Sequence, residues 1–185
     1  MPMSDELLDV VDDNDNVTSQ VSRTVVHQRG LQHRGVHVFL FTRDGRLLIQ
    51  QRSKDRAASP SLLDCSVSEH VQAGEDYLAA AQRGMKEELG LRGTGIREIV
   101  TFRMNYGPHD NEISRLFQGS VDPSLVQFDP VELEGIYYFN LVELLEQMKA
   151  HEEAFCKWFV QIIRWAKGQP SELNVITIQE DVLLP

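Results

Sequence analysis

Short apolar runs separated by polar turns recur along most of the chain and predict a protein rich in β-strands. The first two runs, 7–11 and 17–21, flank the polar stretch 12–16, which is the pattern of a strand–turn–strand hairpin. The run 36–41 is followed by an Asp-Gly turn and a returning strand at 46–51. Further strands are predicted at 62–70, 96–104, 113–121 and 135–139.

Other stretches carry the 3.6-residue periodicity of helices. Helices are predicted at 73–89, 141–149 and 152–167. Gly90 ends the first of them, and its expected buried stripe consists of Leu78, Ala81, Met85 and Leu89. The last helix is so apolar that it fits either the protein core or the interface of a homodimer. Strands and helices together predict an α/β fold.

Length and composition narrow the class of protein. A chain of 185 residues is expected to form a single domain. Hydrophobic residues make up 42% and charged residues 25%, which is ordinary for a folded globular protein and argues against general disorder. The formal net charge of −10 makes the chain a poor candidate for binding a nucleic acid polymer or an anionic membrane.

Cysteine usage and the start of the chain indicate a cytoplasmic protein. Two distant cysteines, Cys65 and Cys156, are too few for a disulfide scaffold and form no Cys-x-x-Cys pair. The first residues show neither the basic region nor the apolar run of a secretory signal. No segment approaches the 18 apolar residues needed to span a membrane. We therefore expect a cytoplasmic location.

One segment is basic in this acidic chain. Residues 23–56 contain eight Arg or Lys residues against two aspartates, a local net charge of +6. Two interpretations follow. These side chains are solvated surface charges, as most surface charges are, or they attract a small anion to this part of the chain.

The predicted helix 73–89 carries a group of acidic residues. Glu87 and Glu88 are adjacent, and Arg83 precedes Glu87 by four positions, which allows an ion pair on the helix surface. Two carboxylates in one turn, close to Glu69, can hold a hard divalent cation such as Mg²⁺ through oxygen atoms. The alternative is a solvated acidic helix face.

The stretch 69–91 resembles the Nudix box, the motif G-x5-E-x7-R-E-U-x-E-E-x-G-U in which U is aliphatic. The positions that match at the required spacing are Glu75, Arg83, Met85, Glu87, Glu88, Gly90 and Leu91. The resemblance extends over roughly residues 30–150. It implies a Nudix-type α/β/α sandwich with a mixed sheet, an N-terminal β-hairpin in an extension at 1–29, and a C-terminal helix, all within one Nudix-like domain 1–185.

Two positions depart from the box. Glu69 stands where the pattern has its first glycine, and Gly84 stands where many family members have a glutamate that ligates metal or acts as general base. A glycine inside a helix costs roughly 1 kcal/mol relative to alanine. One interpretation is a weak enzyme or a non-catalytic binder of phosphorylated ligands. The other is a base recruited from elsewhere, with candidates at Glu69, His70, Glu132 and Glu134.

The flanks resemble the branch of the family that is related to isopentenyl-diphosphate isomerase. His33 and His70 stand at histidine positions of that enzyme; for His33, a structural role competes with a metal or phosphate role. The isomerase has a cysteine two residues before the second histidine, whereas this chain has Ser68 there, and Cys65 comes three residues too early. A serine hydroxyl is a much poorer acid and nucleophile than a thiol near neutral pH, which disfavours isomerisation.

The resemblance implies hydrolysis of a diphosphate linkage in a small phosphorylated substrate of the nucleoside-diphosphate type. Glu87 and Glu88 would hold Mg²⁺ or Mn²⁺, which lowers the pKa of a bound water. Arg83, anchored by Glu75, would orient these carboxylates. The expected substrate-binding residues are Arg52, Arg56 and His70, and the expected catalytic residues are Glu69, Arg83, Glu87 and Glu88.

Overall fold

The computed structural model describes residues 5–180 and residue 184; residues 1–4 of the predicted extension lie outside the described part. The strands are β1 Leu7–Val11, β2 Val17–Ser22, β3 His33–Phe41, β4 Leu47–Arg52, β5 Leu63–Asp64, β6 Val67–His70, β7 Ile96–Gly107, β8 Asp110–Ser120, β9 Leu133–Phe139 and β10 Asn174–Ile178. The helices are α1 Arg23–Arg29, α2 Tyr77–Leu89, α3 Leu141–Ala150 and α4 Lys157–Ala166, with 3-10 turns at Pro123–Leu125 and Glu152–Ala154.

Strand β3 is the centre of the sheet. It runs parallel to β8 over nine residue pairs, from His33 opposite Glu112 to Phe41 opposite Ser120. It also pairs with β6 in antiparallel register. The residues of β3 from Val36 to Leu40 are buried on both faces, which explains why this stretch is almost continuously apolar. The strand order is β10-β7-β8-β3-β1-β2, and β4 extends the sheet from β3 to β5 and β9.

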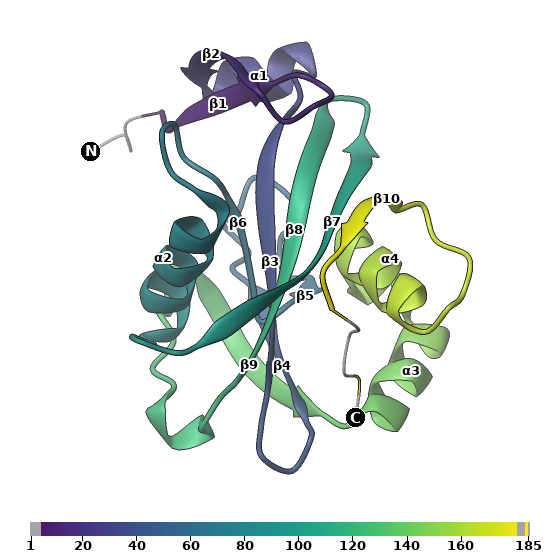
Figure 1. Cartoon of the computed structure of the whole chain (residues 1–185). Helices are drawn as coiled ribbons and strands as arrows, with labels where there is room; N and C mark the ends of the chain where they lie inside the picture. Colours follow the sequence, from purple (N-terminus) through teal and green to yellow (C-terminus); the bar gives the residue numbers. More distant parts are fainter. Residues whose placement is uncertain (1–4, 181–183, 185) are drawn as a thin grey trace.

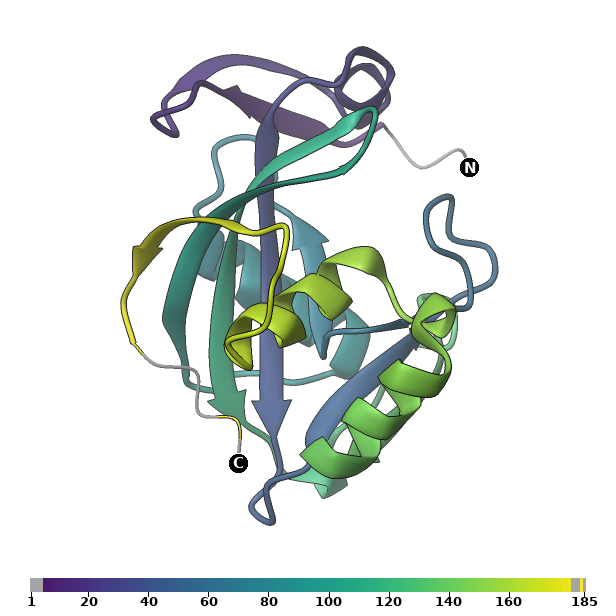
Figure 2. The same cartoon turned by 90° about the vertical axis from the view of Figure 1, so that its right-hand side faces the viewer.

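Helices cover both faces of this mixed sheet, which confirms the predicted α/β/α sandwich. Helix α2 packs on one face (Figure 1), where its inner residues join a core cluster with Val38, Leu40 and Phe117. Helices α3 and α4 cover the other face (Figure 2), where Phe159 packs against Phe39. The two core clusters hold the central strands in fixed positions. That the whole chain 1–185 is one domain stays a prediction.

The boundaries of α2 follow from its caps. The carboxylate of Asp76 accepts a hydrogen bond from the Ala79 N–H, so the helix begins at Tyr77 and not at residue 73. Gly90 ends it as predicted, in the left-handed conformation with φ 69°, and its N–H bonds the carbonyl of Lys86.

Three sequence predictions are corrected by the structure. Leu78 is 43% exposed, because Tyr77 takes the inward position in the first turn of α2. The strand predicted at 62–70 is divided into β5 and β6. The helix predicted at 152–167 is interrupted at Cys156, whose N–H donates to the Leu63 carbonyl at 2.8 Å and thereby holds the backbone extended beside β5. Helix α1 and strand β10 were not predicted from the sequence.

The N-terminal segment forms the predicted hairpin of β1 and β2, with α1 after it, at the top of the molecule in Figure 1. Charged contacts fasten this segment to the sheet and to α2. Arg34 donates to Asp15 at 2.6 Å, and the hydroxyl of Tyr77 donates to the same carboxylate at 3.0 Å. Within residues 5–180 and 184, every helix is too short or too polar to cross a bilayer.

Replacement of Tyr77 with Phe tests how firmly the N-terminal segment is held. The change removes the hydroxyl that bonds Asp15 but keeps the buried ring, so we expect a loss of about 1 kcal/mol of unfolding free energy in urea. Tyr137→Phe is the matched control, because that hydroxyl bonds Gln51 at the exposed surface. An equal loss in both variants would contradict a special role for the Tyr77–Asp15 contact.

Candidate active site

A pocket of about 590 Å³ lies where β3, β6 and β8 meet α1. Segments far apart in the sequence line it, including the loop after β4 and the first turn of α4. Its polar lining residues are Arg23, Thr24, His27, His37, Arg52, Asp55, Arg56, Ser68, Glu69, His70, Tyr106, Asp110, Glu112 and Trp158. A pocket with convergent titratable groups and aromatic side chains is the expected form of a small-molecule site.

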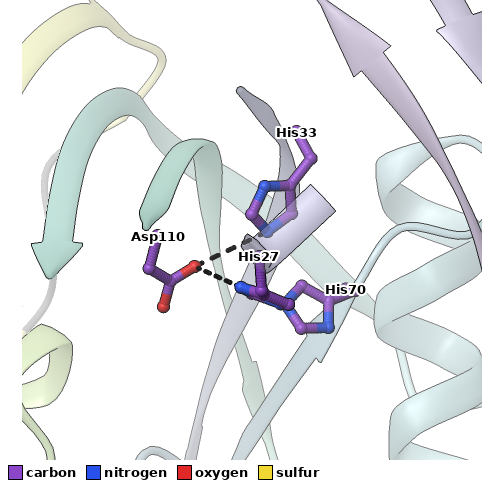
Figure 3. Close-up of side chains that lie close together, drawn as sticks. All are labelled: His27, His33, His70 and Asp110. Carbon is purple, nitrogen blue, oxygen red and sulfur yellow. Dashed lines mark ion pairs between the residues drawn. The ribbon is translucent and has the colours of Figure 1, made fainter. Parts of the chain in front are cut away.

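Three histidines and an aspartate form a cluster at one end of this pocket, and all of them except His33 line it. His27 comes from α1, His33 from β3, His70 from β6 and Asp110 from β8, and their potential ligand atoms all lie within 4.8 Å of one another. Figure 3 shows the Asp110 carboxylate directed at the rings of His27 and His33, at 3.6 and 3.7 Å. The imidazole rings themselves are 5.0 to 5.2 Å apart.

Two buried atoms of this cluster have no hydrogen-bond partner in the described part of the chain. They are Nε2 of His33 and Oδ1 of Asp110. Nδ1 of His33 lies 3.0 Å from the carbonyl of Leu31, to which it donates, so Nε2 offers a lone pair to the cluster once His33 is neutral. Burial acts to lower the pKa of His33, but the contact with Glu112 outweighs it and raises the pKa, so a cation at Nε2 takes the place of a proton. Unpaired buried polar atoms are costly, and a cation between them would satisfy both.

Burial and neighbouring charges set the protonation of the cluster. Burial raises the pKa of Asp110 to about 7, and the charge of Glu112 contributes. Burial also holds the pKa of His70 well below its ordinary value, so this imidazole is neutral and free to ligate. Burial acts to raise the pKa of Glu112, but the contact with His33 outweighs it and lowers the pKa to about 2.

The donor set fits a divalent cation that accepts imidazole nitrogen, such as Mn²⁺, better than it fits Mg²⁺, which prefers oxygen.

His27 and Asp110 were not predicted from the sequence, which placed the metal at Glu87 and Glu88. Neither missed residue lies in a recognised motif. Their only signal in the sequence was the proximity of His27 to His33 and of Asp110 to Glu112.

Arg83 makes the expected contacts with Glu75 and Glu87, and its role in orienting the box carboxylates stays a prediction. Its guanidinium makes two hydrogen bonds to the Glu75 carboxylate, at 3.0 and 3.1 Å, and one to the His70 carbonyl at 2.8 Å. It also lies 3.6 Å from Glu69 and 3.4 Å from Glu87. Arg83 therefore ties α2 to the strand that carries Glu69 and His70.

Glu88 and Glu87 face different surroundings. The side chain of Glu88 is 1% exposed and lies 3.1 Å from Arg56, whereas the side chain of Glu87 is 54% exposed and contacts Arg83. Burial and the nearby Glu69 carboxylate raise the pKa of Glu88 well above its ordinary value. Burial raises the pKa of Glu69 too, although Arg83 opposes the shift. Glu69 and Glu88 thus lie close enough for the charge of one to oppose ionisation of the other.

The space around Gly84 explains both departures from the box. A Cβ atom at position 84 would lie 2.8 Å from Cγ of Glu69 and 2.5 Å from Cγ1 of Val67. Such distances are not tolerated, so the side chain of Glu69 occupies the room that a residue at 84 would need. Glu69 therefore brings a carboxylate to the place from which the box glutamate is missing.

The remaining predicted residues are distributed around the pocket. Arg52 lines it and forms a buried ion pair with Asp64 at 3.1 Å, and Arg56 lies at its edge between Glu88 and Glu132. Glu134 lies apart from it and accepts a hydrogen bond from the Lys54 N–H. Buried Cys65 does not line the pocket, whereas Ser68 does.

Comparisons with known proteins find related sequences and a related fold. Residues 31–159 match the family model described as NUDIX domain. The chain is 34% identical to an isopentenyl-diphosphate Delta-isomerase of Serratia proteamaculans, over 86% of this chain and 90% of that protein. It is 41% identical to an uncharacterized Nudix hydrolase of Streptomyces coelicolor over about half of each chain. The crystal structure of DR0079 from Deinococcus radiodurans superposes with a TM-score of 0.72 at 27% identity, covering 86% of this chain and 98% of that one.

Removal of the Asp110 carboxylate tests the cluster as a cation site. We expect Asp110→Asn to weaken Mn²⁺ binding at least about tenfold in calorimetry, which is ~1.4 kcal/mol. His109→Gln, in the same turn and exposed, is the matched control and should bind like the wild type. Equal binding by all three proteins would contradict the assignment.

The pH dependence of binding provides a second test. Asp110 must lose its proton to ligate, and its pKa is raised to about 7. Mn²⁺ affinity should therefore rise between pH 6 and pH 8, with proton release that shrinks as the pH passes 7. An affinity that falls over this range would rule out ligation by Asp110.

Proposed function

Because the chain belongs to the Nudix family, we propose that its pocket hydrolyses a diphosphate linkage in a small phosphorylated substrate of the nucleoside-diphosphate type. The reaction requires a divalent cation, Mg²⁺ or Mn²⁺. The cytoplasmic location and the homodimer stay predictions from the sequence.

The observation that carries this proposal is the pairing of Glu69 with Glu88. Gly84 removes one carboxylate from the box, but Glu69 fills the vacated space and lies against buried Glu88. Oε2 of Glu88 is buried and has no hydrogen-bond donor among the described residues. Two carboxylates with an unsatisfied oxygen suit a hard cation such as Mg²⁺. This argues against the alternative that Gly84 marks a non-catalytic binder.

Arginine side chains supply the complementary charge for a diphosphate. Arg23, Arg52 and Arg56 line the same pocket from α1, β4 and the following loop. Asp64 holds Arg52 in place through a buried ion pair, so little side-chain freedom is lost when a phosphate binds. A divalent cation bound beside them would neutralise phosphate charge and lower the pKa of a coordinated water.

The second candidate is isomerisation of a prenyl diphosphate, which is the activity in the name of the Serratia relative. The pocket offers no thiol for it among the described residues. Ser68 occupies the position of the cysteine, and the thiol of Cys65 is fully buried outside the pocket, with its pKa raised well above the ordinary value by burial. The protein should therefore not exchange solvent deuterium into isopentenyl diphosphate, and exchange at enzymatic rates would favour the isomerase.

Single substitutions in α2 test the cation assignment. A panel of nucleoside, sugar, coenzyme and dinucleotide diphosphates, with and without Mg²⁺ or Mn²⁺, should yield a cation-dependent substrate. On that substrate we expect Glu88→Gln to lower kcat by about 10²-fold or more, the scale of an electrostatic catalytic group. Glu87→Gln is the matched variant. Its kcat should fall by less than about tenfold, because the side chain of Glu87 is exposed and forms an ion pair with Arg83. Equal losses would restore Glu87 as a ligand.

An exchange of the two unusual box positions tests the replacement of the missing carboxylate. Glu69→Gly alone should remove most turnover, and Gly84→Glu alone should destabilise the fold, because the new side chain collides with Glu69 and Val67. A variant that combines Glu69→Gly and Gly84→Glu with Val67→Ala relieves both contacts and returns the carboxylate to its usual box position. Its kcat should be at least about tenfold higher than that of a Glu69→Gly, Val67→Ala control. An equal kcat in these two variants, both folded, would show that positions 69 and 84 are not interchangeable.

A further inference from the structure

A continuous chain of close polar contacts runs along the wall of the pocket from Asp64 to Glu112, and four of its six side chains, His37, Ser68, Tyr106 and Glu112, line the pocket. The hydroxyl of Ser68 lies 3.0 Å from Oδ1 of Asp64 and 3.0 Å from Nδ1 of His37. Nε2 of His37 lies 3.2 Å from the hydroxyl of Tyr106. That hydroxyl is 3.3 Å from the hydroxyl of Ser114, which in turn donates to Oε2 of Glu112 at 2.8 Å.

While His37 is neutral, the chain has one hydrogen fewer than it needs for a hydrogen bond at every contact. Five contacts connect the six side chains. The two end groups are carboxylates that only accept, and the two serines, Tyr106 and a neutral imidazole supply four hydrogens. An imidazolium supplies the fifth. One added proton on His37 therefore completes every hydrogen bond in the chain.

The surroundings of His37 keep it neutral at rest, while two nearby carboxylates reduce the cost of charging it. Burial lowers its pKa, and Arg52 acts in the same direction, while Glu112 and Asp64 oppose the shift. Phe102 and Trp158 stack on its ring at 6.1 and 6.3 Å between centroids. Tyr106 keeps its own proton, because burial raises its pKa well above the ordinary value.

We propose that His37 is the general base of the reaction, acting through the hydroxyl of Ser68, which lines the pocket. The assignment rests on the proposed hydrolysis. As a water oxygen forms its bond to phosphorus, one water proton passes to Oγ of Ser68, while the serine's own hydrogen turns from Asp64 to Nδ1 of His37 and is transferred to it. The proton taken from the water then becomes the hydroxyl hydrogen of Ser68, which donates to Asp64 as before. The bond from phosphorus to the bridging oxygen breaks, and that oxygen leaves with its electron pair. The proton returns to solvent from the imidazolium after product release.

The arrangement requires one resting tautomer of His37. Charge-assisted bonds hold the Ser68 hydrogen on Asp64 and the Ser114 hydrogen on Glu112. A base at Nδ1 requires the proton of neutral His37 to lie on Nε2, where it donates to Tyr106. The contact without a hydrogen is then the one between Nδ1 of His37 and Oγ of Ser68, at the wall of the pocket.

Nitrogen NMR of the full-length protein without added metal reads this tautomer directly. The ¹⁵N shifts of His37 should show the neutral Nε2–H form at pH 7, with a titration midpoint below the ordinary histidine value of 6.5. Ser68→Ala should lower that midpoint by roughly half a pH unit or more, because the imidazolium loses an acceptor. A resting Nδ1–H form, or a titration midpoint that Ser68→Ala leaves unchanged, would overturn the proposal.

Kinetics supply the second readout. His37→Gln and Ser68→Ala should each lower kcat by about 10² to 10⁴-fold with KM changed less than about threefold, and the double variant should lose no more than the worse single one. The acid limb of the kcat profile should match the NMR midpoint and vanish in His37→Gln. Exposed His151→Gln is the control and should behave as wild type. Retained kcat or an unchanged acid limb in His37→Gln would refute the proposal.

The two readouts separate this inference from the function on which it rests. If the wild type cleaves no diphosphate in the panel, the proposed hydrolase function is wrong. The tautomer of His37 and the effect of Ser68→Ala on its titration midpoint would still show whether the two residues are coupled. If the wild type is active but the titration of His37 does not depend on Ser68, only the assignment of His37 as general base is wrong.

Discussion

The close packing of β6 and β8 on either side of Gly35 is the constraint on which the site depends. Gly35 pairs with His70 on one side and with Ser114 on the other. A Cβ atom at this position would lie 2.1 Å from Oε2 of Glu112, so a side chain here would expel that carboxylate. The same registers set His33 opposite Glu112 and His37 opposite Ser68. One small residue thus permits both the histidine cluster and the hydrogen-bonded chain.

The structural features that lie within one segment of the chain could be predicted from the sequence. Helix α2, its end at Gly90 and the contact of Arg83 with Glu75 follow from spacing within a single segment. The histidine cluster could not, because its members come from α1, β3, β6 and β8, and only the register of distant strands brings them together. Leu78 and the helix predicted at 152–167 were wrong for a related reason, since tertiary contacts of Tyr77 and Cys156 overrode the local pattern.

Two kinds of donor lie in or beside the pocket, close to one set of arginines. The histidines and Asp110 offer mainly nitrogen, whereas Glu69 and Glu88 offer only oxygen. Two donor sets of different softness favour two cations of different type, and a diphosphate held by Arg52 and Arg56 would lie between them. In the proposed mechanism, the hydroxyl of Ser68 transfers a proton where the related isomerases are expected to have a thiol.

The central claim is that this pocket binds divalent cations together with a diphosphate. The most direct measurement is anomalous diffraction from crystals soaked in Mn²⁺ and a non-hydrolysable imidodiphosphate nucleotide. The account predicts an anomalous peak among His27, His33, His70 and Asp110, a second beside Glu69 and Glu88, and phosphate density against Arg52 and Arg56. Density for the nucleotide elsewhere, with no peak at either donor set, would contradict it.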